Sequence, residues 1–86
     1  MRVSELITRF IITEKTIRLA EKENKVTIAV PLSASKREIK KQVEKAYGVK
    51  VVKVNTAITM KGEKKAVVKL SPESNAFELL TRLGLV

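Results

Sequence analysis

Residues 51–70, VVKVNTAITMKGEKKAVVKL, place the tightest constraint on the fold, because apolar and polar residues alternate on both sides of a glycine. Two alternating runs joined by a short glycine-containing turn are typical of a β-hairpin. A two-residue loop would set Val54 opposite Lys69 and mix apolar with charged residues on each face. A three-residue loop over residues 61–63 sets Val54 opposite Leu70 instead. Because a slip of one residue inverts every side chain, the apolar pattern favours the three-residue loop.

In this register one face of the hairpin is apolar and the other is basic. The apolar face has Thr56 opposite Val68 and Ile58 opposite Ala66. The basic face carries a ridge of polar and charged side chains, with one further lysine at the tip: Lys53, Asn55, Lys65, Lys69 and Lys61. The hairpin is therefore predicted to pack through one face and to leave its lysines in solvent.

Residues 33–48, SASKREIKKQVEKAYG, predict a helix between the hairpin and the preceding strand. Ser35 and Glu38 have the spacing of a capping box, in which each side chain accepts a hydrogen bond from the other residue's backbone N–H. Gly48 suits the left-handed position that ends many helices. The predicted buried side consists of Ile39, Val43, Ala46 and Tyr47, and the outer side of Lys36, Arg37, Lys40, Lys41 and Lys45.

The remaining elements have weaker signals. Residues 6–12 predict a short first strand, and residues 25–30 alternate as a second strand that Pro31 ends. Thr13 is the predicted cap of a helix over 14–22, with Asn24 at its end and one side marked by Ile17, Ala20 and Glu21. A last helix is predicted over 74–83, capped by Ser74 and closed by Gly84, with Phe77, Leu80 and Leu83 on one side.

The predicted order is β-α-β-α-β-β-α in one domain, residues 1–86. A crossover from strand 25–30 through the helix to strand 50–60 leaves room for strand 64–71 between these two parallel strands. The sequence thus predicts an α+β fold: a small split β-α-β domain, with a mostly antiparallel four-stranded sheet and helices packed on it.

Charge is concentrated in the middle of the chain. The whole sequence has 18 basic and 9 acidic residues, and residues 25–71 alone hold twelve basic and three acidic ones. Such a cluster is the electrostatic footprint expected of a polyanion-binding protein, although a solvated lysine-rich surface is the alternative interpretation. Histidine, aspartate and cysteine are absent, so neither an enzyme, a cofactor nor a small-molecule substrate is predicted. The absence of a signal peptide or long apolar segment predicts a cytoplasmic protein without membrane insertion.

The three aromatic residues do not form a platform for stacking bases. Tyr47 and Phe77 occupy predicted packing positions in helices, and Phe10 stands alone. Single-strand RNA modules read bases by stacking them on aromatic side chains of a sheet. The basic residues are therefore predicted to contact phosphates and sugars of folded RNA and to recognise its shape.

Three segments in order, ITEKT (12–16), SKREIKKQVEKAYGVKVVKVNT (35–56) and KKAVVKLSPESNAFEL (64–79), resemble the universal large-subunit ribosomal protein L23 family. The third fits best: two basic residues, alanine, two β-branched residues, a basic residue, leucine and a small polar residue. The resemblance spans most of residues 12–83. The short loop at 61–63 stands where bacterial members carry a long extension, which implies an archaeal-type member with little contact to the tunnel wall.

The resemblance implies binding to large-subunit rRNA beside the peptide tunnel exit, next to other ribosomal proteins, and a docking surface for signal recognition particle. It implies RNA-facing or rim positions at Thr13, Lys15, Lys36, Lys40, Asn55, Thr56, Lys64 and Lys65. Glu14 lies where the family has a docking acid, but a first-turn glutamate also simply favours a helix start. A small basic chromatin or general nucleic-acid-binding protein, and a plain protein-interaction module, are the alternative functions.

Overall fold

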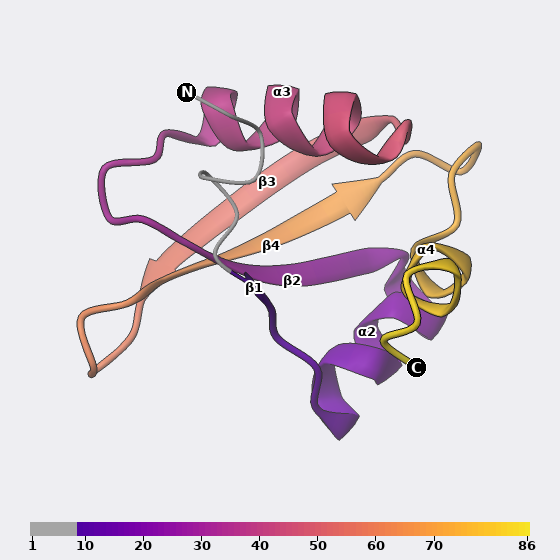
Figure 1. Ribbon diagram of the computed structural model, residues 1–86, viewed down its shortest axis with the longest axis horizontal. Helices are drawn as coiled ribbons and strands as arrows, with labels where there is room; N and C mark the ends of the chain where they lie inside the picture. Colours follow the sequence, from indigo (N-terminus) through magenta and orange to yellow (C-terminus); the bar gives the residue numbers. More distant parts are fainter. Residues whose placement is uncertain (1–8) are drawn as a thin grey trace.

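The computed structural model describes residues 9–86 as one sheet with helices packed on it (Figure 1). In chain order the elements are β1 (Arg9–Phe10), α2 (Glu14–Glu23), β2 (Lys25–Val30), α3 (Lys36–Tyr47), β3 (Val51–Ile58), β4 (Lys64–Leu70) and α4 (Ala76–Arg82). The strand order is β1-β2-β4-β3, and every neighbouring pair is antiparallel. Because β4 lies between β2 and β3, the predicted split β-α-β arrangement and the α+β class are confirmed.

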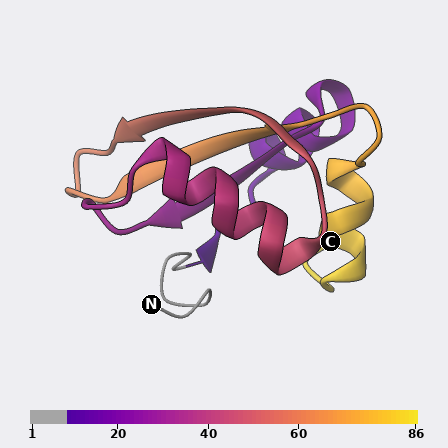
Figure 2. The ribbon, with the colours of Figure 1, turned by 90° about the horizontal axis from the view of Figure 1, so that it is seen from above.

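The core lies on the sheet face that α3 covers. Val26, Ile28, Val68 and Leu70 project from β2 and β4 into it, together with Ile39 from α3, and each is at most 1% exposed. In Figure 2, α3 lies below the strands and α2 above them. On the opposite face of the sheet, α2 contacts β2. Thr27 and Ala29 of β2 are buried on this face. Beyond β2, the same face of β4 and β3 is left largely open.

Thr13 caps α2, as predicted. Its Oγ1 accepts a hydrogen bond from the Thr16 N–H at 3.2 Å, and its own N–H donates to Thr16 Oγ1 at 2.8 Å. On the side marked by Ile17, Ala20 and Glu21 only Ala20 is buried, and the second buried residue of the helix is Thr16. The capping bonds satisfy the Thr16 hydroxyl, so this residue can face inward without an unpaired polar group.

The capping box of α3 is confirmed. The Ser35 N–H donates to Glu38 Oε1 at 3.0 Å, and the Glu38 N–H donates to Ser35 Oγ at 3.2 Å. Gly48 ends the helix with φ 65°. The buried stripe runs at i+4 spacing from Ile39 through Val43 to the half-buried Tyr47, and the predicted inward-facing Ala46 falls beside this stripe and is exposed.

The last helix is shorter than the predicted 74–83. Asn75 rather than Ser74 is its cap, with Oδ1 accepting from the Glu78 N–H at 2.8 Å. The Ser74 hydroxyl instead accepts from the Lys50 N–H at 3.0 Å and joins the chain segments that precede β3 and α4. Leu79 and Leu80 are buried, whereas Leu83, predicted to pack, is 39% exposed because it lies at the helix C-cap.

The predicted first strand over 6–12 is shorter among the described residues. Residues 6–8 lie outside them, and β1 itself comprises only Arg9–Phe10. The Ile11 N–H still donates to the Thr27 carbonyl at 2.9 Å, and the chain then leaves the sheet so that Thr13 can cap α2.

The hairpin has the predicted three-residue loop, but over residues 60–62 and not 61–63. The Thr59 N–H donates to the Glu63 carbonyl at 2.8 Å, and Gly62 closes the loop with φ 79°. Glycine takes this left-handed last position more readily than glutamate does, which explains the shift. Val54 consequently pairs with Val68.

The shift moves the strands by two residues, so the predicted faces are kept. Thr56 pairs with Ala66 and Ile58 with Lys64. The core position predicted for Ile58 is wrong: the side chain lies at the end of the sheet and is 67% exposed. No helix within residues 9–86 is long and apolar enough to cross a membrane.

Candidate nucleic-acid interface

Three lysines form a row across the open face of the sheet. Lys25 of β2 lies opposite Lys69 of β4, which lies opposite Lys53 of β3. Lys53 and Lys69 are exposed, and Lys25 forms an ion pair with Glu23 at 2.9 Å. Like charges directly opposite each other across strands are unfavourable, and Glu23 offsets this repulsion at Lys25, so the repulsion is concentrated at the facing pair of Lys53 and Lys69.

Two neighbouring rows complete the open face. Asn55 lies opposite Val67, and Lys65 lies between Ala29 and Ala57. The structure thus brings together four of the predicted RNA-binding residues on one face, and we call them the open-face residues: Lys53, Asn55, Lys65 and Lys69. Their contact to phosphates and sugars stays a prediction.

Strand alternation separates the two adjacent pairs that the family resemblance singled out. Asn55 and Lys65 lie on the open face, whereas Thr56 and Lys64 project toward the α3 side. The Lys64 Nζ donates to the Ala34 carbonyl at 2.8 Å and thereby ties β4 to the turn before α3. Thr56 lies opposite the buried Ala66 and is half-buried. One member of each pair therefore serves the packing side of the sheet.

A hollow between α3 and the edge strand β3 gathers further cations. It has a volume of about 350 Å³ and is lined by Lys36, Arg37, Lys40, Val52, Lys53 and Val54. The predicted RNA-binding residues Lys36 and Lys40 are therefore neighbours of Lys53, although they belong to different elements. We call this the α3 hollow.

A β-bulge interrupts the edge strand beside Lys53. The pairing with β4 slips between Val51 and Lys53, so that Val51 is buried and Val52 is 57% exposed. Val52 also lines a second hollow, which we call the α2 hollow, of about 600 Å³ together with Lys22, Glu23, Asn24, Lys69, Leu70 and Pro72. The bulge thus places one apolar side chain between two hollows that both contain lysines.

The other predicted positions lie apart from the lysine row. Thr13 uses its hydroxyl to cap α2, and Glu14 is exposed in the first turn of that helix. Lys15 lines a shallow hollow on the outer side of α2 with Arg18, Leu19, Lys22 and Glu23. Lys61 is exposed at the hairpin tip, beyond the opposite end of β3 from Lys53.

Lys22 and Lys25 were missed by the sequence analysis. Lys22 follows Lys15 by seven residues, which places both on one side of a helix. Lys25 is the first residue of an alternating strand and is out of phase with Val26 and Ile28, which predicts the face away from the core. Both signals were present in the sequence, although Lys22 lies outside the basic segment 25–71 and Lys25 is its first residue.

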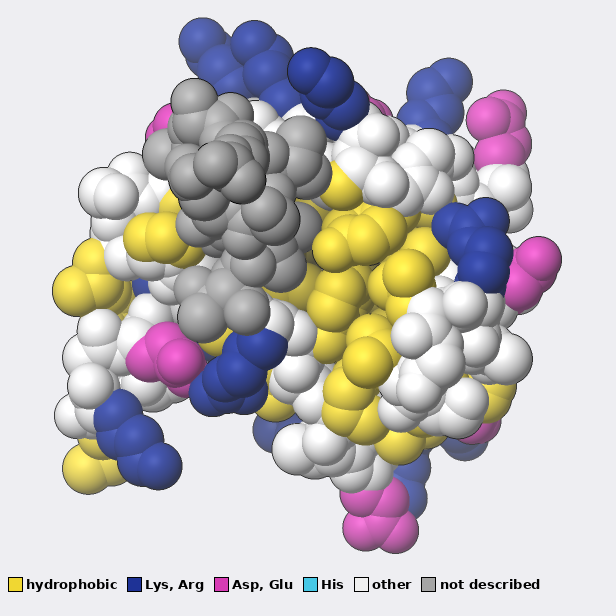
Figure 3. All heavy atoms as spheres, viewed as in Figure 1, with side chains coloured by type: hydrophobic (Ala, Val, Ile, Leu, Met, Phe, Trp, Pro, Cys, Tyr) yellow, Lys and Arg dark blue, Asp and Glu magenta, His cyan; other side chains and the backbone are white. Residues whose placement is uncertain are grey.

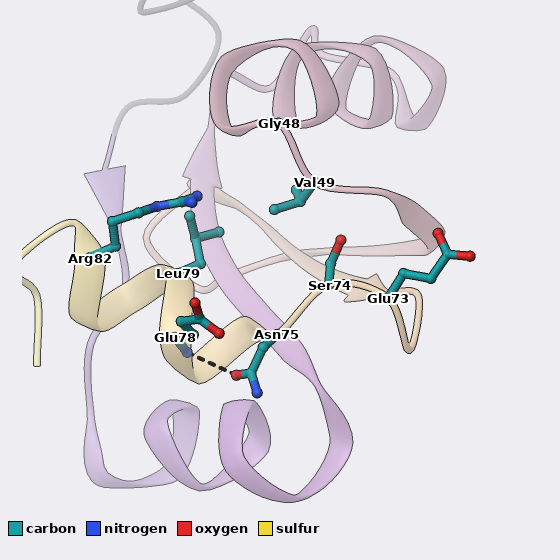
Figure 4. A pocket seen from close by; sticks show the side chains of 8 residues that line it. All are labelled: Gly48, Val49, Glu73, Ser74, Asn75, Glu78, Leu79 and Arg82. Atoms are coloured by element: carbon teal, nitrogen blue, oxygen red, sulfur yellow. Dashed lines mark hydrogen bonds between the residues drawn. The ribbon is translucent and has the colours of Figure 1, made fainter.

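A fourth hollow, at the α4 end, has a different character (Figure 4). Its volume is about 160 Å³, and Glu73 and Glu78 line it together with Gly48, Val49, Ser74, Asn75, Leu79 and Arg82. Arg82 donates to the Tyr47 carbonyl at 3.1 Å. Two carboxylates repel a polyanion, so this hollow does not extend the basic surface.

The face that carries α3 is also not predominantly basic. In Figure 3 hydrophobic atoms gather near its centre, and Lys and Arg side chains lie around its margin. Phe10 and Tyr47 pack edge to face with ring centroids 5.5 Å apart at the border of the core. Burial raises the pKa of the Tyr47 hydroxyl above its ordinary value of 10.0.

Comparison with known proteins identifies the family. The model of the ribosomal protein L23 family matches residues 5–78. A large ribosomal subunit protein uL23 from Caldivirga maquilingensis is 64% identical over 86 residues, the full length of both chains. A protein of the same name from Pyrobaculum aerophilum is 56% identical over 81 residues, which are 94% of this chain and all of that protein.

These findings confirm the resemblance that three sequence segments had indicated. Both relatives are archaeal, in agreement with the short hairpin loop. The family also bears on the prediction that the chain is not an enzyme. Its members are structural ribosomal proteins, so this prediction is confirmed. The chain belongs to the ribosomal protein L23 family.

Proposed function

We propose that this chain is a structural constituent of the large ribosomal subunit and binds large-subunit rRNA through the open-face residues and the lysines beside them. The observation that carries the proposal is the row of Lys25, Lys69 and Lys53 across three strands. Through its family the chain is a protein of the cytoplasmic ribosome, where neighbouring ribosomal proteins are its further partners.

The mode of binding is contact to the sugar–phosphate backbone. Lysine ammonium groups neutralise phosphates without reading sequence, and the amide of Asn55 is suited to a phosphate oxygen or a ribose 2′-hydroxyl. Since the open face offers no aromatic ring for stacking, recognition depends on the shape of folded RNA. The rRNA would in turn relieve the repulsion within the lysine row.

A second part of the proposal concerns the peptide tunnel exit. Glu14 is exposed at the start of α2, away from the lysine row, and rRNA repels a carboxylate. Together with the resemblance of residues 12–16 to the family, this supports a docking role for Glu14 toward signal recognition particle. The short loop at residues 60–62 supports little contact with the tunnel wall.

The test is an rRNA-binding titration with matched charge changes. Replacing Lys53, Lys65 and Lys69 by Gln together should weaken binding to in vitro transcribed large-subunit rRNA of Caldivirga maquilingensis. The slope of log K against log salt should become less steep by about 2 to 3, because each lost phosphate contact changes it by roughly one.

The control replaces three other exposed lysines by Gln: Lys41, Lys45 and Lys50. Net charge changes equally, but we expect the control to lose much less affinity. Equal losses from both triple variants would contradict a localised interface. Equal affinity of the wild-type chain for random duplex DNA would favour a general nucleic-acid-binding protein instead.

A further inference from the structure

We propose that the bulged Val52 enters the minor groove of an RNA double helix, and that the lysines of the α3 and α2 hollows contact the two strands that border this groove. This inference rests on the proposed function and specifies which form of RNA the surface fits. It assigns a role to Val52, Lys22 and Arg37, which are not among the predicted RNA-binding residues.

The first observation is the bulge itself. A bulge inserts one residue into an edge strand and redirects its side chain, and it is often found beside functional sites. Here it separates the buried Val51 from Val52, which is 57% exposed although it is apolar. Several apolar side chains of this chain are exposed, and Val52 differs from them in that it is redirected by the bulge and lies in the linings of two basic hollows.

The second observation is that Val52 lines both hollows. On one side the α3 hollow contributes Lys36, Arg37 and Lys40, and on the other side the α2 hollow contributes Lys22 and Lys69. Glu23 is the one acidic residue in either lining, and its carboxylate is paired with Lys25 at 2.9 Å. The surface therefore consists of two groups of cations that share one apolar residue, Val52, which we call the ridge, and that meet at the cross-strand pair of Lys53 and Lys69.

Double-stranded RNA offers a surface of complementary character. Its minor groove is wide and shallow, presents ribose 2′-hydroxyls, and is bordered by one phosphate backbone on each side. A strand edge that carries a small apolar side chain can approach such a groove while cations on both sides reach the two backbones. The minor groove of B-DNA is only about 6 Å wide, which is too narrow for a β-strand edge. The geometry thus favours duplex RNA over duplex DNA.

The inference is tested by hydroxyl-radical footprinting on the large-subunit rRNA of Caldivirga maquilingensis. The wild-type chain should protect two tracts of ribose on opposite strands of one helix, facing each other across the minor groove. The double variant Lys36→Gln/Lys40→Gln should lose one tract, and Lys22→Gln/Lys69→Gln should lose the other. The control Lys41→Gln/Lys45→Gln, outside both hollows, should retain both tracts.

The ridge is tested with two exposed apolar residues of β3. Val52→Glu puts a carboxylate between the two backbones and should lower rRNA affinity about tenfold or more, because like charges brought together at an interface are strongly unfavourable. Ile58→Glu changes charge equally on the same strand, 67% exposed and outside both hollows, and should lower affinity far less. Thermal unfolding of both variants checks that each remains folded.

The outcomes separate this inference from the proposed function. Tight rRNA binding with protection confined to one strand, or loss of both tracts in both double variants, would overturn the groove-straddling mode and leave rRNA binding intact. Equal losses for Val52→Glu and Ile58→Glu would overturn the role of the ridge. Absence of any rRNA binding by the wild-type chain would overturn the proposed function and this inference together.

Discussion

Lys64 and Lys65 are adjacent in β4, yet their side chains leave the strand on opposite faces of the sheet. The Lys64 ammonium donates to the Ala34 carbonyl at 2.8 Å, whereas Lys65 projects from the open face between Ala29 and Ala57. Lys64 thus has a structural role, whereas Lys65 has a proposed role in RNA binding.

Replacing each lysine by methionine should separate these roles. Lys64→Met removes the side-chain partner of the carbonyl of the buried Ala34 and should lower the free energy of unfolding by about 1–3 kcal/mol. Lys65→Met should leave stability nearly unchanged and weaken rRNA binding. Urea denaturation and an rRNA titration of both variants measure the two effects; the reverse assignment would mean that the faces of β4 are wrong.

Asn24 should be among the most sensitive positions of the fold. Its Nδ2 donates to the carbonyls of Leu70, Ser71 and Ser74, its Oδ1 accepts from the Ala76 N–H at 2.7 Å, and its backbone has φ 57°. Asn24→Gly keeps the left-handed backbone but loses all these side-chain bonds, so we expect a loss of about 2–4 kcal/mol. If chemical denaturation showed Asn24→Gly to be as stable as the wild type, backbone conformation alone would explain the residue.

Stability at acidic pH should report the capping box of α3. The hydrogen bonds from the Ser35 backbone and hydroxyl hold the pKa of Glu38 below its ordinary value of 4.5. Because the pKa is lower in the folded state, the charged form adds stability that is present above about pH 4.5 and is lost as pH falls through the lower folded-state pKa.

The matched variant is Glu38→Gln, which keeps a capping hydrogen-bond acceptor but does not titrate. The wild type should melt at a higher temperature near pH 7, and the difference should shrink as the pH falls below 4.5. A difference in melting temperature that stays constant from pH 7 to pH 3 would show that ionisation of Glu38 does not contribute.

Glu14→Ala tests docking against a simple helix-start role. A first-turn glutamate contributes only about 0.3–1 kcal/mol to a helix, so the variant should still fold and enter ribosomes. Its ribosomes should bind signal recognition particle more weakly in a titration. Glu21→Ala, exposed on the same helix outside the first turn, is the matched control. Identical affinities for all three ribosomes would leave Glu14 with the helix-start role.

Most of the fold could be predicted because local signals agreed with the tertiary structure. The capping box at Ser35 and Glu38, the left-handed positions of Asn24 and Gly48, and the alternation of the hairpin each specify conformation within a few residues. The hairpin loop was misplaced by one residue, but the resulting two-residue shift preserved the faces of both strands. The predicted fold was therefore unaffected by the misplaced loop.

The interface was harder to predict because it depends on contacts between distant segments. VVKV gives no local sign that the second valine is bulged outward, since both valines suit a buried strand. Likewise, nothing near Lys64 in sequence indicates the Ala34 carbonyl as its partner. The family resemblance marked Lys64 and Lys65 as a pair, and only the strand geometry separates them.

Sedimentation of the endogenous protein through a high-salt gradient tests the central claim most directly. Cell extract of the source organism is washed in high salt, ribosomal subunits are separated, and the chain is detected with an antibody. We predict that it still sediments with the large subunit, as a structural constituent of that subunit should, although salt weakens each phosphate contact. Recovery in the soluble fraction, or with chromosomal DNA, would contradict a structural role in the large ribosomal subunit.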